Sequence, residues 1–209
     1  MNLDDMINNQ TISPAGADIL RTIADTRQSF LVHALPQHAG KTTTVQAILA
    51  EVPPSVPCQE FFGTEHEFAT LATAQRHGYL LVAEIGHHGR PGYLAGPEVP
   101  PVFDLISRGY ALASSLHADT VDQVYEVLAT NGVPKSVAAR VPYLIKVRML
   151  RNTAGTHVRR VVDEIHEITT SSDGSPSASL LYRWDGETSN GQTSWSQEPE
   201  HTHQAPHHR

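Results

Sequence analysis

The chain has 209 residues, of which 39% are hydrophobic, and a formal net charge of −7 at pH 7. This length favours one domain, or one domain plus a tail, and the acidic balance argues against a nucleic-acid partner, which needs clustered Lys and Arg. The single cysteine, Cys58, excludes an intrachain disulfide and is typical of a reduced, cytoplasmic chain. No run approaches 18 apolar residues and the start of the chain is polar, so we expect neither membrane insertion nor a secretory signal.

The first 14 residues are predicted to be a flexible N-terminal lead, because the first ten are polar and acidic. Ser13-Pro14 is typical of a helix start, since proline suits the first helical turn. An apolar stripe at helical spacing then predicts a helix to about Thr26.

A strand-like apolar run at 30–35 leads through a short loop into Gly40-Lys41-Thr42 and a helix. Strand, loop ending in G-K-[ST], helix is the P-loop arrangement, in which the helix N–H groups and dipole favour phosphate. At these positions Lys41 would reach the β- and γ-phosphates of a nucleotide, and the Thr42 hydroxyl would bind Mg²⁺. The predicted nucleotide-binding residues are Gly40, Lys41, Thr42 and Thr43.

The loop departs from the full pattern G-x-x-x-x-G-K-[ST], because Leu35 holds the position of its first glycine. If Leu35 had to adopt a positive φ, the strain would cost about 1–2 kcal/mol. From these residues alone, an ordinary strand-to-helix turn with a lysine in the first helical turn stays open as the alternative.

The middle of the chain predicts a short strand at 58–62, a helix at 64–74 capped by Thr64, and a buried strand at 79–85. That last strand carries Glu84 at its end, where open α/β sheets gather functional residues. Glu84 would orient or deprotonate an attacking water, or hold Mg²⁺ through a water; the alternative is a glutamate at the surface.

The segment 86–101 is predicted to be a loop, followed by a short helix ending at Gly109. A third buried strand at 110–116 runs directly into His117 and a helix capped near Thr120. A histidine at this strand tip would hydrogen-bond a γ-phosphate, or else a neighbouring loop.

After a short helix opened by Pro134, we predict a strand at 143–150 and two antiparallel strands at 158–168 and 180–184. Residues 187–209 are predicted to be a disordered, His-rich tail whose four histidines have no specific metal function. The predicted fold over residues 15–186 is therefore α/β: a mostly parallel central sheet flanked by helices, with antiparallel C-terminal strands.

Four stretches resemble the C-terminal ATPase domain of the type II and type IV secretion and type IV pilus ATPases. Residues 35–44 resemble the family's GPTGSGKTTT loop, and residues 83–87 its Walker B text GEIRD. Residues 109–120 resemble its histidine box, the most specific of these motifs, and residues 160–168 its strand R-x-V-x-E-I-x-E-I. The resemblance covers about residues 15–186.

The resemblance implies a RecA-like P-loop NTPase that binds ATP and Mg²⁺, with Lys41, Glu84 and His117 as catalytic residues. It also implies a homo- or hetero-oligomer with secretion or pilus ATPase subunits. Glu60 is the nearest match to the family's acidic box.

The departures from the family keep an alternative open: a non-hydrolysing, nucleotide-binding regulator or scaffold. Leu35 and His38 replace loop glycines, and Gly86 stands at the Walker B arginine position. Only about 25 residues precede the P-loop strand, where the family has an N-terminal domain that contributes arginines to a neighbouring site. We therefore expect low activity of the chain alone, or dependence on a separate full-length ATPase.

Overall fold

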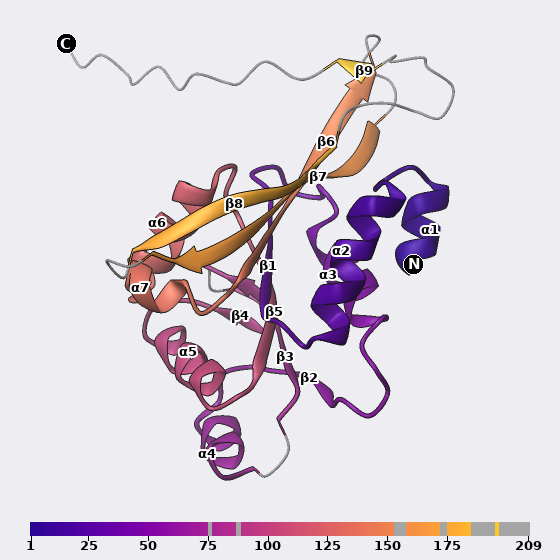
Figure 1. The fold of residues 1–209 in the computed structure, drawn as a ribbon. Helices are drawn as coiled ribbons and strands as arrows, with labels where there is room; N and C mark the ends of the chain where they lie inside the picture. The colour runs from indigo at the N-terminus through magenta and orange to yellow at the C-terminus, as the bar shows by residue number, and fades with distance from the viewer. Residues whose placement is uncertain (75–76, 87–88, 153–157, 172–174, 185–194, 197–209) are drawn as a thin grey trace, which may run out of the picture.

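The structure, a computed structural model, describes residues 1–74, 77–86, 89–152, 158–171, 175–184 and 195–196. Within these residues the strands form one sheet in the order β2-β3-β5-β1-β6-β7-β8, with helices on both faces (Figure 1). The strands are β1 (Phe30–His33), β2 (Cys58–Glu60), β3 (Tyr79–Ile85), β4 (Tyr93–Leu94), β5 (Ala111–Leu116), β6 (Tyr143–Asn152), β7 (Val158–Thr170), β8 (Pro176–Arg183) and β9 (Trp195–Ser196). The α-helices are α1 (Leu3–Asn8), α2 (Pro14–Asp25), α3 (Lys41–Leu49), α4 (Glu65–Thr73), α5 (Pro100–Ser107), α6 (Val121–Thr130) and α7 (Lys135–Ala138).

The sheet is parallel on one side and antiparallel on the other. Strands β2, β3, β5, β1 and β6 run parallel, and β7 and β8 continue the sheet antiparallel. The short strands β4 and β9 pair with β3 and β6. The predicted α/β fold, with a mostly parallel sheet and antiparallel C-terminal strands, is confirmed.

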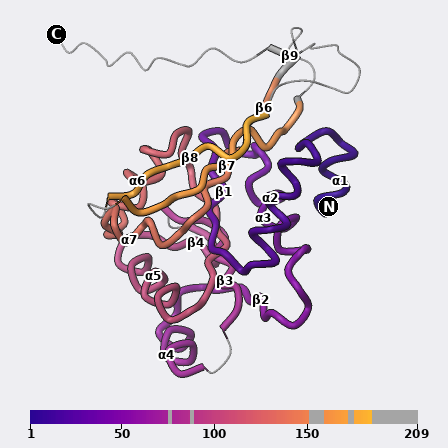
Figure 2. The backbone as a smooth tube through the Cα atoms, viewed as in Figure 1, coloured from indigo at the N-terminus to yellow at the C-terminus, as the bar shows by residue number. Residues whose placement is uncertain are grey.

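Two helical layers cover the sheet because the central strands are apolar on both faces. In β1, Phe30 and Val32 pack with the layer of α1, α2 and α3, while Leu31 packs with the layer of α4, α5, α6 and α7. Figure 2 traces the two layers on opposite sides of the strands. None of the helices in the described part of the chain has the length and hydrophobicity needed to cross a bilayer.

The N-terminal lead is not loose at residues 3–8, where the prediction is wrong. These residues form α1, with Asn2 and Asp5 in a capping box and the side chains of Leu3 and Met6 buried. Arg21 of α2 forms an ion pair with Asp4 of α1, with 2.6 Å between Nη2 and Oδ1, and so links the two helices. The following segment joins the sheet, since the Val162 amide donates to the Thr11 carbonyl at 2.8 Å.

Other boundaries lie close to those predicted from the sequence, with three corrections. The strand predicted at 180–184 is β8, which already begins at Pro176. Ser13 caps α2, and Thr64 with Glu67 forms the capping box of α4. The segment 86–101 is not all loop, because it contains β4 and a turn of 3₁₀ helix at Gly96–Glu98. In the predicted tail, Trp195–Ser196 pair with β6, while 187–194 and 197–209 lie outside the described residues.

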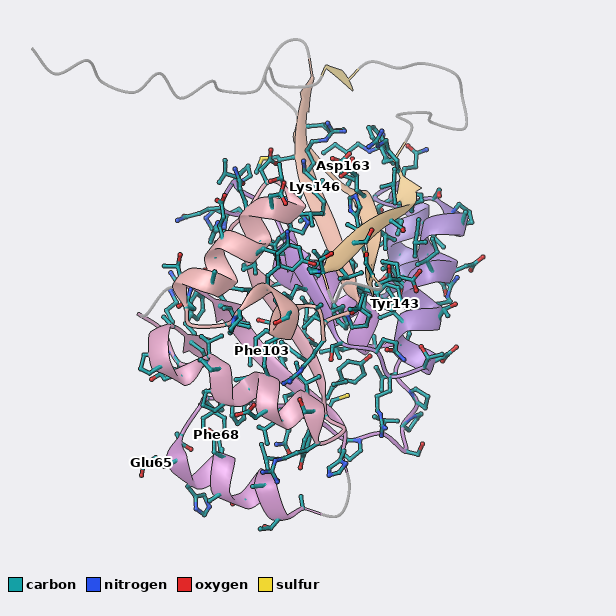
Figure 3. The ribbon with its side chains drawn as sticks, turned by 60° about the vertical axis from the view of Figure 1, so that its left-hand side comes forward. Glu65, Phe68, Phe103, Tyr143, Lys146 and Asp163 are labelled. Atoms are coloured by element: carbon teal, nitrogen blue, oxygen red, sulfur yellow. The ribbon has the colours of Figure 1, made fainter. Side chains whose placement is uncertain are left out.

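Charged residues gather where β6 meets β7. A bulge follows the pairing of Lys146 with Glu164. Beside it, Asp163 forms an ion pair with Arg148, with 2.7 Å between Oδ1 and Nη2. Lys146 lies 4.0 Å from Asp163 and 3.1 Å from Asp119, the second residue after His117 (Figure 3). This ion-pair cluster ties the antiparallel strands to the loop that follows β5.

Candidate functional site

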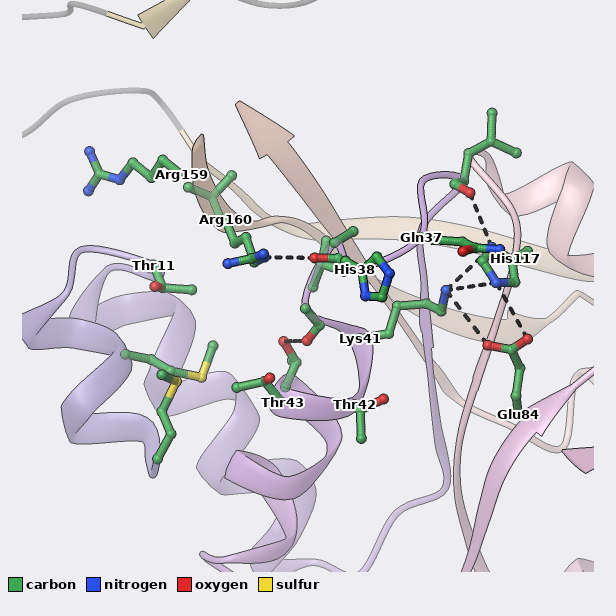
Figure 4. Close-up of a pocket in the computed structure, with 18 of the residues that line it drawn as sticks. Thr11, Gln37, His38, Lys41, Thr42, Thr43, Glu84, His117, Arg159 and Arg160 are labelled. Carbon is green, nitrogen blue, oxygen red and sulfur yellow. Dashed lines mark hydrogen bonds and ion pairs between the residues drawn. The ribbon is translucent and has the colours of Figure 1, made fainter. Parts of the chain in front are cut away.

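A cavity of about 1180 Å³ opens beyond the carboxyl ends of β1, β3 and β5. One wall is the 34–40 loop and the first turn of α3, and the opposite wall carries Glu84 and His117 (Figure 4). The cavity continues past the loop toward α1 and β7, where Asn9, Thr11 and Arg159 line it. Its position agrees with the general rule that open α/β sheets bind ligands beyond their strand ends.

The three residues singled out from the sequence lie together. The Nζ atom of Lys41 is 3.8 Å from an oxygen of Glu84 and 3.3 Å from Nε2 of His117, and Nε2 of His117 is 3.4 Å from the other Glu84 oxygen. Lys41 and Glu84 are each 7% exposed. Burial lowers the pKa of Lys41, and the negative charge of Glu84 opposes this shift in part.

One hydrogen bond fixes the orientation of His117. Nδ1 lies 3.1 Å from the carbonyl oxygen of Leu35. Because a carbonyl only accepts, Nδ1 carries the proton. Nε2 then accepts from the Lys41 ammonium or, once protonated, donates to Glu84. The imidazole therefore links the start of the 34–40 loop to the carboxylate on β3.

A bulge in β3 sets the position of Glu84. Val82 pairs with Ser114 and Ile85 with Leu116, so two residues of β3 stand opposite the single residue Ser115. The Ser115 hydroxyl donates to the Ala83 carbonyl at 2.9 Å. Bulges re-aim side chains next to functional sites, and the strand pattern in the sequence does not reveal this one.

The 34–40 loop reaches its shape without strain at Leu35. Positive φ falls on His38, at 62°, and on Gly40, at 102°, and Leu35 lies outside that region. The strain considered for Leu35 is therefore absent. His38 carries a cost of about 1 kcal/mol instead, less than for a β-branched residue because histidine is among the types enriched in this conformation.

The first turn of α3 fits an anion. Gly40 is its N-cap and has no side chain to bond the first N–H groups, and the side chains of Thr42 and Thr43 are exposed and line the cavity. N–H groups of this kind, with the helix dipole, attract phosphate, while Lys41 adds a cation. No group of three or more His, Cys, Asp or Glu suited to a metal occurs among the described residues. The Thr42 hydroxyl, exposed at the cavity, is a group that could hold Mg²⁺ together with phosphate oxygens.

Glu60, the match to the acidic box, lies on the exposed strand β2. Together with Thr42 it lines a separate, smaller cavity of about 190 Å³. The structure thus brings Glu60 to the far side of Thr42 rather than to the wall formed by Glu84 and His117.

Sequence reasoning missed the contribution of β7. Arg160 donates from Nε to the His38 carbonyl at 2.7 Å, and Arg159 donates to the Gln10 carbonyl at 2.6 Å. Both arginines line the cavity. The pairing of β7 with β6 brings them there from more than 110 positions away in the chain, and no local pattern marks that contact.

His33, the last residue of β1, was also missed. Its Nδ1 lies 3.1 Å from the Ala118 carbonyl, so it links the strand before the loop to the residue after His117. The side chain is 1% exposed, and Nε2 has no hydrogen-bond partner in the described structure. Burial lowers its pKa to about 4, which keeps the ring neutral at pH 7.

No protein-family model matches the chain, and no curated protein does. Solved structures do match its fold, and three of them are secretion ATPases. The VirB11 ATPase from the Brucella suis type IV secretion system, in complex with sulphate, matches with a TM-score of 0.54 and 15% identity over 72% of this chain and 51% of that one. The ATPase DotB of Yersinia pseudotuberculosis matches with a TM-score of 0.56 and 12% identity, over 83% of this chain and 49% of that one. DotB of Legionella pneumophila matches with a TM-score of 0.50 and 15% identity, over 77% of this chain and 48% of that one.

The chain has the fold of the type IV secretion ATPases. The resemblance drawn from the sequence motifs is thereby supported by an independent comparison of backbones. The chain spans about half the length of these secretion ATPases. At 12–15% identity the likeness is one of fold, and the roles of single residues have to come from their chemistry.

Proposed function

We propose that the chain binds ATP with Mg²⁺ and hydrolyses it as a motor-type domain of a secretion or pilus assembly system. The observation that carries the proposal is the meeting of Lys41, from one side of the cavity, with Glu84 and His117 from the other. A cation at the start of α3 can stabilise the transferring phosphoryl group, a carboxylate at the end of β3 can position the attacking water, and an imidazole after β5 adds a hydrogen-bonding group. In this proposal the fold is RecA-like and the 34–40 loop is a P-loop.

Lys41 binds the β- and γ-phosphates, while the N–H groups at the start of α3 and the side chains of Thr42 and Thr43 surround them. Bound Mg²⁺ supplies charge neutralisation on the phosphate oxygens. Before nucleotide enters, Lys41 contacts Glu84 and His117. On binding it exchanges these contacts for phosphate oxygens.

Glu84 then orients a water or accepts its proton, since the bulge of β3 brings it within 3.8 Å of Lys41, across the cavity from the start of α3. As an imidazolium, His117 donates from Nδ1 to the Leu35 carbonyl and from Nε2 to the γ-phosphate. Because that phosphate is lost on hydrolysis, the same contact distinguishes ATP from ADP.

The proposal extends to assembly and location. Because the chain shares the fold of the VirB11 ATPase of a type IV secretion system, we propose that it works in the cytoplasm in an oligomer with secretion or pilus ATPase subunits. The single exposed cysteine, Cys58, fits a reducing compartment.

A second candidate is a regulator that binds nucleotide without useful turnover. It is favoured by the ligand-free contacts of Lys41, which nucleotide has to displace. Replacement of loop glycines by Leu35 and His38 points the same way.

The deciding experiment compares the parent chain with Lys41→Ala and Glu84→Gln. Equilibrium binding of labelled Mg·ATP and release of phosphate are measured on the same samples. Matched controls are Lys135→Ala and Glu126→Gln, which remove the same charges from the exposed sides of α7 and α6.

Hydrolysis predicts that Lys41→Ala loses binding, whereas Glu84→Gln binds like the parent and releases phosphate at least about 100-fold more slowly. Binding by the parent with no release above Lys41→Ala would favour the regulator. A parent that binds no nucleotide would overturn both candidates.

A further inference from the structure

We infer that Arg160 of β7 is a positioning residue that holds the 34–40 loop open to receive phosphate. The inference rests on the proposed function, because it assigns the residue that prepares the same site. It concerns the loop before ligand arrives, when no phosphate is present to organise it.

The contact is direct and comes from a fixed strand. Nε of Arg160 donates to the carbonyl oxygen of His38 at 2.7 Å, as Figure 4 shows. Arg160 pairs with Met149 in the ladder between β7 and β6. Because β6 pairs in turn with β1, the sheet that carries the loop also carries the side chain that holds it.

The loop needs such a contact at this position. His38 has a φ of 62°, a conformation that glycine adopts far more readily. A residue in this region keeps its conformation only when its surroundings determine it. The guanidinium group fixes the His38 carbonyl, which lies two residues before the helix N-cap at Gly40.

Gly40 leaves room for the arginine stem. A Cβ at Gly40 would stand 3.2 Å from Cδ of Arg160, closer than side chains normally approach. The aliphatic part of Arg160 therefore lies over Gly40 while its nitrogen bonds His38. Arg160 therefore bonds one positive-φ residue of the loop and lies beside the other.

The neighbouring arginine has a different task. Arg159 donates to the Gln10 carbonyl at 2.6 Å and its side-chain oxygen at 2.8 Å, and it stacks on Trp184. Successive side chains of a strand point to opposite faces. Arg159 therefore secures the N-terminal segment, whereas the loop contact among the described residues comes from Arg160.

Two substitutions separate this role from a direct charge contact with nucleotide. In Arg160→Gln the amide nitrogen occupies the position of Nε, so the bond to His38 survives while the charge is lost. Arg160→Met has similar length and neither donor nor charge. Binding of Mg·ATP, phosphate release, hydrogen exchange of the amides at 37–40 without nucleotide, and the urea midpoint are measured for both and for the parent.

We expect Arg160→Gln to bind within about twofold of the parent, and Arg160→Met to bind about 5–10-fold more weakly, with faster exchange confined to the loop and an unchanged urea midpoint. In Arg160→Met the weaker binding should appear in the phosphate-release assay as a raised KM. Equal losses of affinity in the two variants would overturn the inference, as would parental affinity in Arg160→Met.

The proposed function can fail separately. If the parent binds no nucleotide, that function is wrong, and the exchange data still decide whether Arg160 holds the loop. Faster loop exchange in Arg160→Met but not in Arg160→Gln then supports the holding contact, and equal exchange overturns it.

Discussion

The ammonium of Lys41 lies 3.8 Å from the carboxylate of Glu84, and both side chains are buried at the edge of one cavity. Burial is the larger influence on Lys41 and lowers its pKa, while the charge of Glu84 raises it. The pair thus places a cation and a base next to each other before any ligand binds.

Removal of the Glu84 charge should lower the pKa of Lys41 further. In Glu84→Gln the desolvation of Lys41 persists, and the attraction that opposes it is gone. The measurement is an NMR titration of the Lys41 side chain in ligand-free protein. Glu126→Gln on the exposed side of α6 is the control, and a Lys41 pKa that rises or stays constant in Glu84→Gln would contradict the arrangement.

His117 should decide how well the site distinguishes ATP from ADP. His117→Asn keeps a side-chain donor near the position of Nδ1 for the Leu35 carbonyl and loses the reach of Nε2. We expect ATP affinity to fall about tenfold, which corresponds to one charge-assisted hydrogen bond, and ADP affinity to stay nearly constant.

Calorimetric titration with Mg·ATP and Mg·ADP checks this split. His66→Asn, on the exposed side of α4, is the matched control. Equal losses for both nucleotides would mean that His117 supports the loop without contacting the γ-phosphate.

Local patterns are enough to predict the elements that build the site. The continuous apolar run at Tyr79–Ile85 is a strand with these bounds, and Thr64 caps α4 as its spacing indicates. The carboxyl ends of parallel strands meet at one sheet edge, so Lys41, Glu84 and His117 were expected together, and they lie together.

Features that depend on distant contacts were not predictable. Residues 3–8 are polar enough that their sequence predicts a flexible segment. They form α1 because the side chains of Leu3 and Met6 are buried against the rest of the protein and Arg21 forms an ion pair with Asp4. The contact of Arg160 with His38 joins positions 122 residues apart. The bulge at Glu84 depends on pairing with β5, which the sequence of β3 alone does not encode.

Restoring the family's glycines should have different effects at the two loop positions. Leu35 has no positive φ, so Leu35→Gly only adds freedom to the unfolded chain and should lower the free energy of unfolding by about 0.4–1 kcal/mol. At His38, whose φ is 62°, relief of strain offsets that entropy, and His38→Gly should change stability by less than about 0.5 kcal/mol.

Urea denaturation of the two variants beside the parent tests the difference. A Leu35→Gly protein more stable than the parent would show that Leu35 is strained after all. A loss above about 1 kcal/mol in His38→Gly would mean that the imidazole itself supports the loop.

His33 should make the protein less stable in mild acid. Its pKa is lowered from 6.5 to about 4 by burial, with Lys146 and His166 acting in the same direction and the Ala118 carbonyl and Asp119 opposing them. Between these values the unfolded chain binds a proton that the folded chain does not. Stability is therefore greatest above pH 6.5 and falls as the pH drops toward 4, by roughly 3 kcal/mol at most from this residue.

The contribution is isolated by measuring urea stability at pH 7.5 and pH 5.0 in the parent, His33→Asn and His33→Leu. Both substitutions remove the titration, so both should shrink the difference between the two pH values, whereas the exposed control His66→Asn should not. At pH 7.5 His33→Asn should be the more stable of the two, since it keeps a donor for the Ala118 carbonyl that His33→Leu leaves unbonded. An unchanged pH difference in His33→Leu would show that protons taken up by other groups, His166 among them, cause the loss of stability in acid.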